Sequence, residues 1–191
     1  MSRPQRPVVA AVVLAAGAGS RFLGPTHKLR AELRGRPVVS WVFDAVIAAG
    51  FEKVYVVTGA VDLDDLIPSD WVTVRADDWS DGQSRTIQAG LARAEADGVT
   101  AVVVGLGDQP LVPASAWRSV GASAGPVAAA SFDGRLRPPV KLERSVWPLL
   151  PTEGDEGARR ILRERPELVS AIPCTGDPYD IDTVEDLVRW N

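Results

Sequence analysis

The sequence predicts a three-layer α/β/α sandwich around a mostly parallel, Rossmann-like sheet. Two observations support this fold class. Continuous apolar runs rich in β-branched residues recur along the chain, which is typical of strands buried on both faces of a parallel sheet. Stretches with apolar residues at three- and four-residue spacing separate these runs, and this alternation implies right-handed strand–helix–strand crossovers. In such a sheet, functional residues are expected at the carboxyl ends of the strands.

The first half of the chain is predicted to hold strands at residues 8–14, 53–58 and 101–105. A helix over residues 39–49 is expected to end at Gly50, because glycine readily adopts the positive φ found at helix C-termini. A second helix over residues 84–96 has Ser84 as its candidate N-cap and carries its apolar residues on one face.

The second half is predicted to contain a helix at residues 113–120, strands at 127–132 and 136–142, and helices at 156–164 and 183–190. The last helix has Asp182 or Thr183 as its N-cap. Glu185 and Asp186 lie in its first turn, where the helix dipole favours negative charge. Since neither a repeat nor a low-complexity linker interrupts the pattern, residues 1–191 are expected to form one α/β domain of ordinary size.

Composition excludes several classes of partner. The chain has 191 residues, of which 46% are hydrophobic, enough for one ordinary core. The net charge of -4 comes from scattered acidic and basic residues without a basic block, which argues against a nucleic acid partner. The single cysteine, Cys174, excludes an intrachain disulfide and a cysteine metal cluster, and it fits a reducing compartment.

The N-terminus has some features of a signal peptide, because Arg3 and Arg6 precede an apolar run at residues 8–16 and small residues follow. The run is too short to span a bilayer. The glycines and Arg21 directly after it favour a strand that leads into a phosphate-binding loop. We therefore expect a soluble, cytoplasmic protein with no membrane partner.

That loop is the first candidate site, because its small residues would let backbone amides approach an anion. Arg21 and Lys28 would supply the positive charge that a triphosphate requires. The dinucleotide fingerprint is excluded, since Phe22 stands where its last glycine belongs, and a P-loop lysine is absent. The alternative is a tight turn with an arginine in it by chance. The loop residues are Leu14, Ala15, Ala16, Gly17, Ala18, Gly19, Ser20 and Arg21.

Acidic residues form the second candidate site. Asp108 directly follows the strand at 101–105, at the functional edge of the sheet. Asp180 and Asp182 point the same way if their segment is extended. Magnesium prefers a few carboxylates completed by substrate phosphate oxygens, so Asp108 and Asp182 are its candidate ligands. The alternatives are a helix N-cap for Asp182 and a solvated turn residue for Asp180.

Five motifs in this order resemble those of the small nucleotidyltransferases related to molybdenum cofactor cytidylyltransferase. Together they cover nearly the whole chain, so the resemblance is far more specific than any single motif. The matching segments are LAAGAGSR at 14–21 with Lys28, Gly82-Gln83-Ser84 through Gly90-Leu91, GDQP at 107–110, GDEGAR at 154–159 and DIDTVEDL at 180–187.

The resemblance implies a fold of the nucleotide-diphospho-sugar transferase type and a role for each motif. The loop at 14–21 would bind the triphosphate with Lys28, while Gln83 and Ser84 would lie near the base and ribose. Arg21, Lys28 and Asp108 would be catalytic, and Asp108 and Asp182 would hold Mg²⁺. In this family a terminal pterin phosphate attacks the α-phosphorus of the nucleotide and pyrophosphate leaves. A molybdoenzyme or its chaperone would then be a partner.

The choice of substrates depends on fewer residues. Ala16 resembles the cytidylyl members, whereas guanylyl members carry a second glycine, so CTP is the expected donor. The family's Gly-His-Pro-Val is here Arg137-Pro138-Pro139-Val140, which leaves open a sugar phosphate, a phospholactate-type acceptor, or a non-catalytic chaperone that binds a nucleotide or cofactor. His27 is expected to be a loop residue, with a contact to phosphate as a further option. Arg159 either faces solvent or approaches the acceptor's phosphate.

Overall fold

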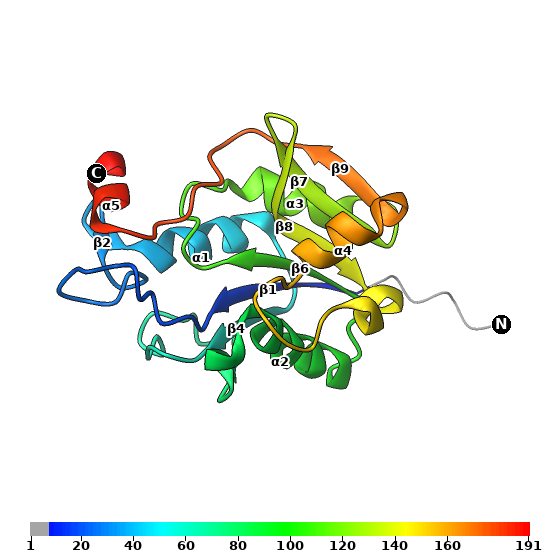
Figure 1. The fold of residues 1–191 in the computed structure, drawn as a ribbon, viewed down its shortest axis with the longest axis horizontal. Helices are drawn as coiled ribbons and strands as arrows, with labels where there is room; N and C mark the ends of the chain where they lie inside the picture. Colours follow the sequence, from blue (N-terminus) through cyan, green and yellow to red (C-terminus); the bar gives the residue numbers. More distant parts are fainter. Residues whose placement is uncertain (1–7) are drawn as a thin grey trace.

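A computed structural model describes residues 8–191, and its centre is one seven-stranded sheet (Figure 1). β8 is antiparallel to both of its neighbours, and every other pair of adjacent strands is parallel. The prediction of a mostly parallel sheet is therefore confirmed. In spatial order the strands are β5 (Val72–Arg75), β4 (Val54–Thr58), β1 (Val9–Ala15), β6 (Ala101–Leu106), β8 (Arg135–Glu143), β7 (Val127–Phe132) and β9 (Val169–Pro173).

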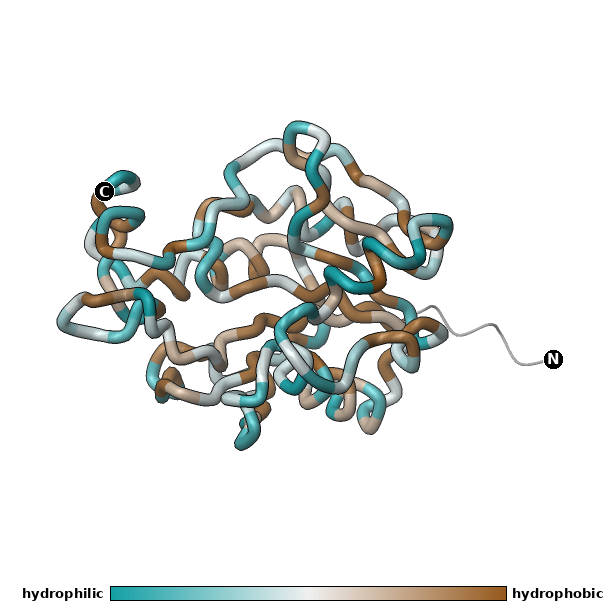
Figure 2. The backbone as a smooth tube through the Cα atoms, viewed as in Figure 1, coloured by the Kyte–Doolittle hydropathy of each residue, from teal (hydrophilic) through white to brown (hydrophobic). Residues whose placement is uncertain are grey.

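Helices cover both faces of this sheet. α1 (Val38–Ala49) and α3 (Ala114–Ala122) pack on one face, and α2 (Gln83–Ala96) and α4 (Arg159–Glu164) pack on the other. Successive residues of β1 point alternately into the two cores, as side chains of a strand must, and both cores are apolar. Figure 2 accordingly shows apolar segments along the central strands. The expected three layers are present.

A smaller cluster closes one end of the molecule. α5 (Val184–Trp190) packs against a short hairpin, β2 (Glu32–Leu33) and β3 (Arg36–Pro37), around buried Phe22, Leu33 and Ile181. Three short 3₁₀ helices complete the elements: η1 (Trp79–Asp81), η2 (Arg144–Leu149) and η3 (Pro166–Leu168). Among residues 8–191, no helix has the length and apolar character needed to cross a membrane.

Most expected elements are confirmed to within a residue at each end. The apolar run at 8–16 forms the central strand β1, while Arg3 and Arg6 lie outside the described residues. Gly50 ends α1 with a φ of 81°, as predicted. Thr183 caps α5 in a capping box with Asp186.

Three boundary predictions are wrong, and one of them is the end of α3, which continues to Ala122 instead of stopping at residue 120. Ser84 does not cap α2, because the helix begins at Gln83 with Gly82 in the cap position. The helix expected at 156–164 begins only at Arg159, since the preceding residues form a turn. The edge strands β5 and β9 and the β2–β3 hairpin were not predicted. They are short and partly exposed, so they lack the continuous apolar run that marks the buried strands.

Candidate active site

The phosphate loop and the acidic motif lie at the same edge of the sheet. β1 and β6 are parallel neighbours, so the residues that follow them emerge together at their carboxyl ends. The Gly107 amide bonds to the Leu14 carbonyl at 2.9 Å, which joins the two segments directly. Ala15 and Ala16 are buried, whereas Gly17 and Ser20 are exposed at the surface of the loop. A ligand can therefore approach the glycine-rich part of the backbone.

His27 braces this loop from inside the protein. Its Nδ1 accepts a hydrogen bond from the Leu29 amide at 3.2 Å, so the proton lies on Nε2, which donates to the Gly17 carbonyl at 3.0 Å. Burial lowers the pKa of His27, the bond to Gly17 opposes this, and the charge on Lys28 adds to it. Both ring nitrogens are engaged within the protein. The expectation that His27 contacts phosphate is therefore not supported, and the ring shapes the loop instead.

Lys28 joins the two predicted metal ligands. Its Nζ lies 2.5 Å from Asp108 Oδ2 and 2.9 Å from Asp182 Oδ1, and the Lys28 side chain is only 11% exposed. Arg21, which is 74% exposed, reaches the second oxygen of Asp182 at 2.9 Å. Burial disfavours the charge on Lys28, but the two carboxylates outweigh it and raise its pKa above the ordinary value. The structure thus brings together Arg21, Lys28, Asp108 and Asp182, from four separate positions in the sequence.

Hydrogen bonds hold the two acidic segments in register. The Ile181 amide donates to the Asp108 carbonyl at 2.8 Å, and Ile181 itself is fully buried. Gln109 Nε2 donates to Asp180 Oδ1 at 2.8 Å, and Asp180 forms no ion pair with Lys28. Burial raises the pKa of Asp180, with nearby Asp108 adding to the effect. Asp180 is therefore a bonded, half-buried residue, and the solvated-turn alternative for it is wrong.

The chemistry of this cluster fits a hard divalent cation. Asp108 Oδ1 is buried and has no hydrogen-bond partner, which leaves one carboxylate oxygen available for a ligand. Within residues 8–191, no group of three or more His, Cys, Asp or Glu side chains is arranged to hold a metal by itself. Asp108 and Asp182 would thus supply two carboxylates, and magnesium commonly takes its remaining ligands from substrate phosphates and water.

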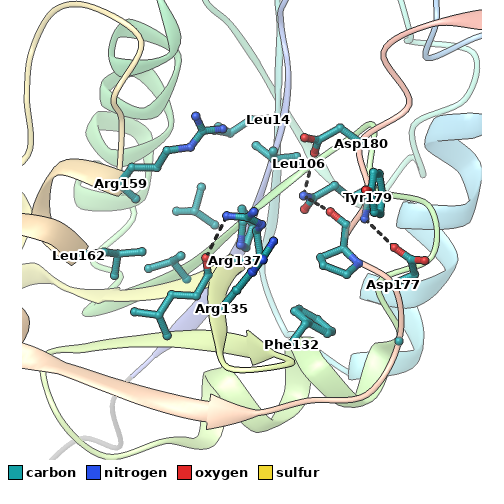
Figure 3. Close-up of a pocket in the computed structure, with 18 of the residues that line it drawn as sticks. Leu14, Leu106, Phe132, Arg135, Arg137, Arg159, Leu162, Asp177, Tyr179 and Asp180 are labelled. Carbon is teal, nitrogen blue, oxygen red and sulfur yellow. Dashed lines mark hydrogen bonds between the residues drawn. The ribbon is translucent and has the colours of Figure 1, made fainter. Parts of the chain in front are cut away.

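A cavity of about 730 Å³ lies beside this cluster. Leu14 and Gln83 line it next to the predicted nucleotide site, and Gln109 and Asp180 line it next to the acidic motif. Figure 3 shows Arg159 extending from α4 toward Leu14. Arg159 is exposed to solvent, as one alternative has it, and it also lines the cavity, which is compatible with the other.

Ser84 does not reach this cavity. Its side chain is completely buried, and its Oγ accepts a hydrogen bond from the Gly157 amide at 3.3 Å. The Ser84 amide also donates to the Gly154 carbonyl at 2.9 Å. A Cβ on Gly82 would lie 2.6 Å from the backbone of Gly154, so glycine is required there. The motif at the start of α2 therefore packs against the GDEGAR segment, and of its predicted nucleotide ligands only Gln83 lines the cavity.

Two cavity residues, Arg135 and Arg137, were not predicted as site residues. They lie on β8, two positions apart, so their side chains leave the same face of the strand. The alternation Arg-Leu-Arg at the start of a strand is the sequence signal that could have found them. Their position relative to α4 follows only from the antiparallel insertion of β8, which no local pattern indicates.

Comparison with known proteins places these features in context. The family model described as MobA-like NTP transferase domain matches residues 11–169. The chain is 31% identical over 206 residues to nicotine blue oxidoreductase of Paenarthrobacter nicotinovorans, an alignment that covers 96% of each protein. It is 30% identical over 200 residues to purine catabolism protein PucB of Bacillus subtilis, covering 96% of this chain and 97% of PucB.

The solved structures show the same fold. Rv0371c of Mycobacterium tuberculosis aligns with a TM-score of 0.82 at 24% identity, covering 96% of this chain and 97% of that one. A complex of Rv0371c with manganese aligns with a TM-score of 0.74 at 25% identity, covering 95% and 97% of the two chains. These likenesses confirm the predicted Rossmann-like fold of the nucleotide-diphospho-sugar transferase type.

Proposed function

This chain belongs to the family of MobA-like NTP transferase domains, a nucleotidyltransferase family, and on that premise we propose its substrates. The enzyme transfers CMP from CTP to the terminal phosphate of a molybdopterin cofactor, with Mg²⁺ as its metal and pyrophosphate as the leaving group. The single cysteine, Cys174, fits a reducing cytoplasm, where we place the reaction. A molybdoenzyme or its chaperone would receive the product.

One observation carries the proposal: Lys28 bridges Asp108 and Asp182 directly beside the glycine-rich loop. A triphosphate needs cations around its oxygens, and its metal needs carboxylates. The cluster offers both within one bonded network. Asp108 Oδ1, buried without a partner, is the oxygen that a metal would satisfy.

Each side chain of the cluster has a distinct part in the transfer. Lys28 and exposed Arg21 neutralise the triphosphate as pyrophosphate departs, and Asp108 and Asp182 would hold the metal. Magnesium, when bound, supplies charge neutralisation at the transferring phosphoryl group. The acceptor phosphate is itself the nucleophile, so no Ser–His pair is needed. Such a reaction depends mainly on positioning and electrostatics.

The donor and the acceptor depend on different features. The choice of CTP as the donor depends on Ala16, which follows the cytidylyl pattern of the loop. The choice of molybdopterin depends on the five family motifs, whereas Pro138 stands where the family has its histidine, which keeps sugar phosphates as alternative acceptors.

A second candidate function is a redox reaction. It is favoured by one observation, the name nicotine blue oxidoreductase of a relative that is 31% identical over almost its whole length. A non-catalytic chaperone is the remaining alternative, and the complete Arg21, Lys28, Asp108 and Asp182 cluster argues against it.

The decisive experiment measures pyrophosphate release with Mg²⁺ and each of CTP, GTP, ATP and UTP, with and without molybdopterin. Release that requires both CTP and molybdopterin supports the proposal. Release only with sugar phosphates moves the acceptor to that class. A parallel assay follows the absorbance of nicotine blue, and its turnover without any pyrophosphate release would favour the redox function. Asp108→Ala is the matched inactive control for transfer.

A further inference from the structure

Three arginines from two distant segments converge on the cavity. Arg135 and Arg137 come from the start of β8, and Arg159 comes from the start of α4. Figure 3 labels all three among the residues that line the cavity. All three residues are exposed to solvent, so water screens their mutual repulsion and an anion in solution can reach them.

The lack of carboxylate partners for these three residues is unusual in this protein. In the part of the chain that the structure describes, Arg135, Arg137 and Arg159 form no ion pair, and Arg137 reaches only the Leu136 carbonyl, at 3.5 Å. Most other arginines are paired with a carboxylate, namely Arg21, Arg30, Arg36, Arg75, Arg85, Arg93, Arg144, Arg160, Arg163 and Arg165.

The cavity wall also contains carboxylates, but none of them forms an ion pair with these three arginines. Asp180 accepts from Gln109, and Asp177 accepts from the Tyr179 amide at 3.0 Å. Asp133 also lines the cavity and pairs with none of the three arginines. The guanidinium groups therefore remain available, and planar forks of this kind bind phosphate and carboxylate groups in a bidentate manner.

The rest of the cavity wall is largely apolar. Leu106, Phe132 and Leu136 contribute to it, and Tyr179 adds a second aromatic ring. A small, fully hydrated sugar phosphate would leave these surfaces without contacts. A ligand with a flat or apolar body and an anionic group at its far end would satisfy both the wall and the arginines.

We propose that Arg135, Arg137 and Arg159 form an anion-binding subsite for a second anionic group of the acceptor, distinct from the phosphate that attacks the nucleotide. This inference rests on the proposed function, because it assumes that an acceptor enters beside the Lys28 cluster. The attacking phosphate must lie near Lys28, and none of the three arginines pairs with the carboxylates there. The enzyme thus selects acceptors that carry at least two separated anionic groups.

The test uses glutamine variants of the three arginines, singly and combined, with Arg160→Gln as the matched control. Arg160 lies on the same helix as Arg159 but pairs with Glu164 outside the cavity. Inorganic phosphate is titrated calorimetrically into protein saturated with Mg²⁺ and a non-hydrolysable CTP analogue, so that the phosphate loop is already filled. We expect the triple variant to bind phosphate at least about tenfold more weakly than wild type and the control to bind equally well.

The kinetic readout is the KM for the acceptor. The triple variant should raise it at least about tenfold, with kcat and the CTP affinity within about threefold of wild type. Unchanged phosphate affinity in the folded triple variant would overturn the subsite, as would an equal loss in Arg160→Gln. If the triple variant fails to fold, the single variants decide by the same criterion. Absence of pyrophosphate release from wild type would refute the proposed function, while the phosphate titration would still decide the anion subsite.

Discussion

Replacing Lys28 by methionine isolates the charge at the centre of the site while keeping a similar side-chain length. Asp108 and Asp182 would then face each other without the cation that now lies 2.5 and 2.9 Å from their oxygens. Their side chains are only 17% and 20% exposed, so water can replace the ammonium group only in part. Removing one partner from a buried ion pair costs about 3 to 5 kcal/mol, and the partial exposure here favours the lower value, about 3 kcal/mol.

For a chain of this length, that loss lowers the melting temperature by about 6 to 12 °C. The measurement is thermal unfolding of wild type and Lys28→Met at neutral pH, with Arg160→Met as an exposed ion-pair control that should change by less than about 1 kcal/mol. Because the pKa of Lys28 is raised, its contribution is fully present at neutral pH and is lost only as the pH rises through that raised value.

Divalent metal provides the sharper part of this experiment. Mg²⁺ can occupy the carboxylates freely in Lys28→Met, but in the wild type it competes with Lys28 when no triphosphate is present. Added Mg²⁺ should therefore stabilise the variant more than the wild type, by about 1.4 kcal/mol at ten times its dissociation constant. Equal melting temperatures for the two proteins, or equal stabilisation of both by Mg²⁺, would refute this account of the cluster.

Three further predictions concern the metal ligands, the loop brace and the contact between motifs. Asp108→Ala and Asp182→Ala should each lower the rate of metal-dependent pyrophosphate release at least about a hundredfold, while the CTP affinity measured by calorimetry changes much less. Equal losses in rate and in affinity would argue against a metal role. Since burial lowers the pKa of His27, the wild type should lose stability as the pH falls from about 7 to about 5. His27→Gln should lose less stability over that range, and parallel pH–stability curves for the two proteins would contradict this. Gly82→Ala combines a φ of 111° with a clash at 2.6 Å and should cost at least about 2 kcal/mol in urea unfolding, whereas Gly98→Ala, with a φ of 73° and open space, should cost only about 1 kcal/mol. A similar cost at both glycines would show that the clash is relieved elsewhere.

Local patterns in the sequence were sufficient for the buried part of the fold. The apolar runs of β1, β4 and β6 and the glycine that ends α1 carry their own signals, because burial on both faces and positive φ select particular residue types. The edge strands β5 and β9 carry a weaker signal, since one side of each remains partly exposed. The prediction that Ser84 caps α2 is wrong for a tertiary reason, because its hydroxyl accepts a hydrogen bond from the amide of Gly157, a residue distant in sequence.

The candidate site divides in the same way. The loop residues and Asp108 could be placed because each directly follows a recognisable strand. The bridge through Lys28, the brace by His27 and the grouping of Arg135 with Arg159 could not, because each joins segments whose distance depends on the order of strands in the sheet. Antiparallel β8 between β6 and β7 is the feature that sequence periodicity does not reveal.

The pairing of Lys28 and Arg21 with two carboxylates has a consequence for how substrates arrive. Two positive and two negative side chains cancel, so this cluster of four carries no net charge at rest. A bare magnesium ion must displace an ammonium group to enter, and a bare triphosphate meets two carboxylates. With the magnesium–triphosphate complex, the metal pairs with the two carboxylates and the phosphate oxygens pair with Lys28 and Arg21. All four side chains then keep a partner of opposite charge. We therefore expect the preassembled complex to be the species that the enzyme captures, with neither component binding tightly ahead of the other.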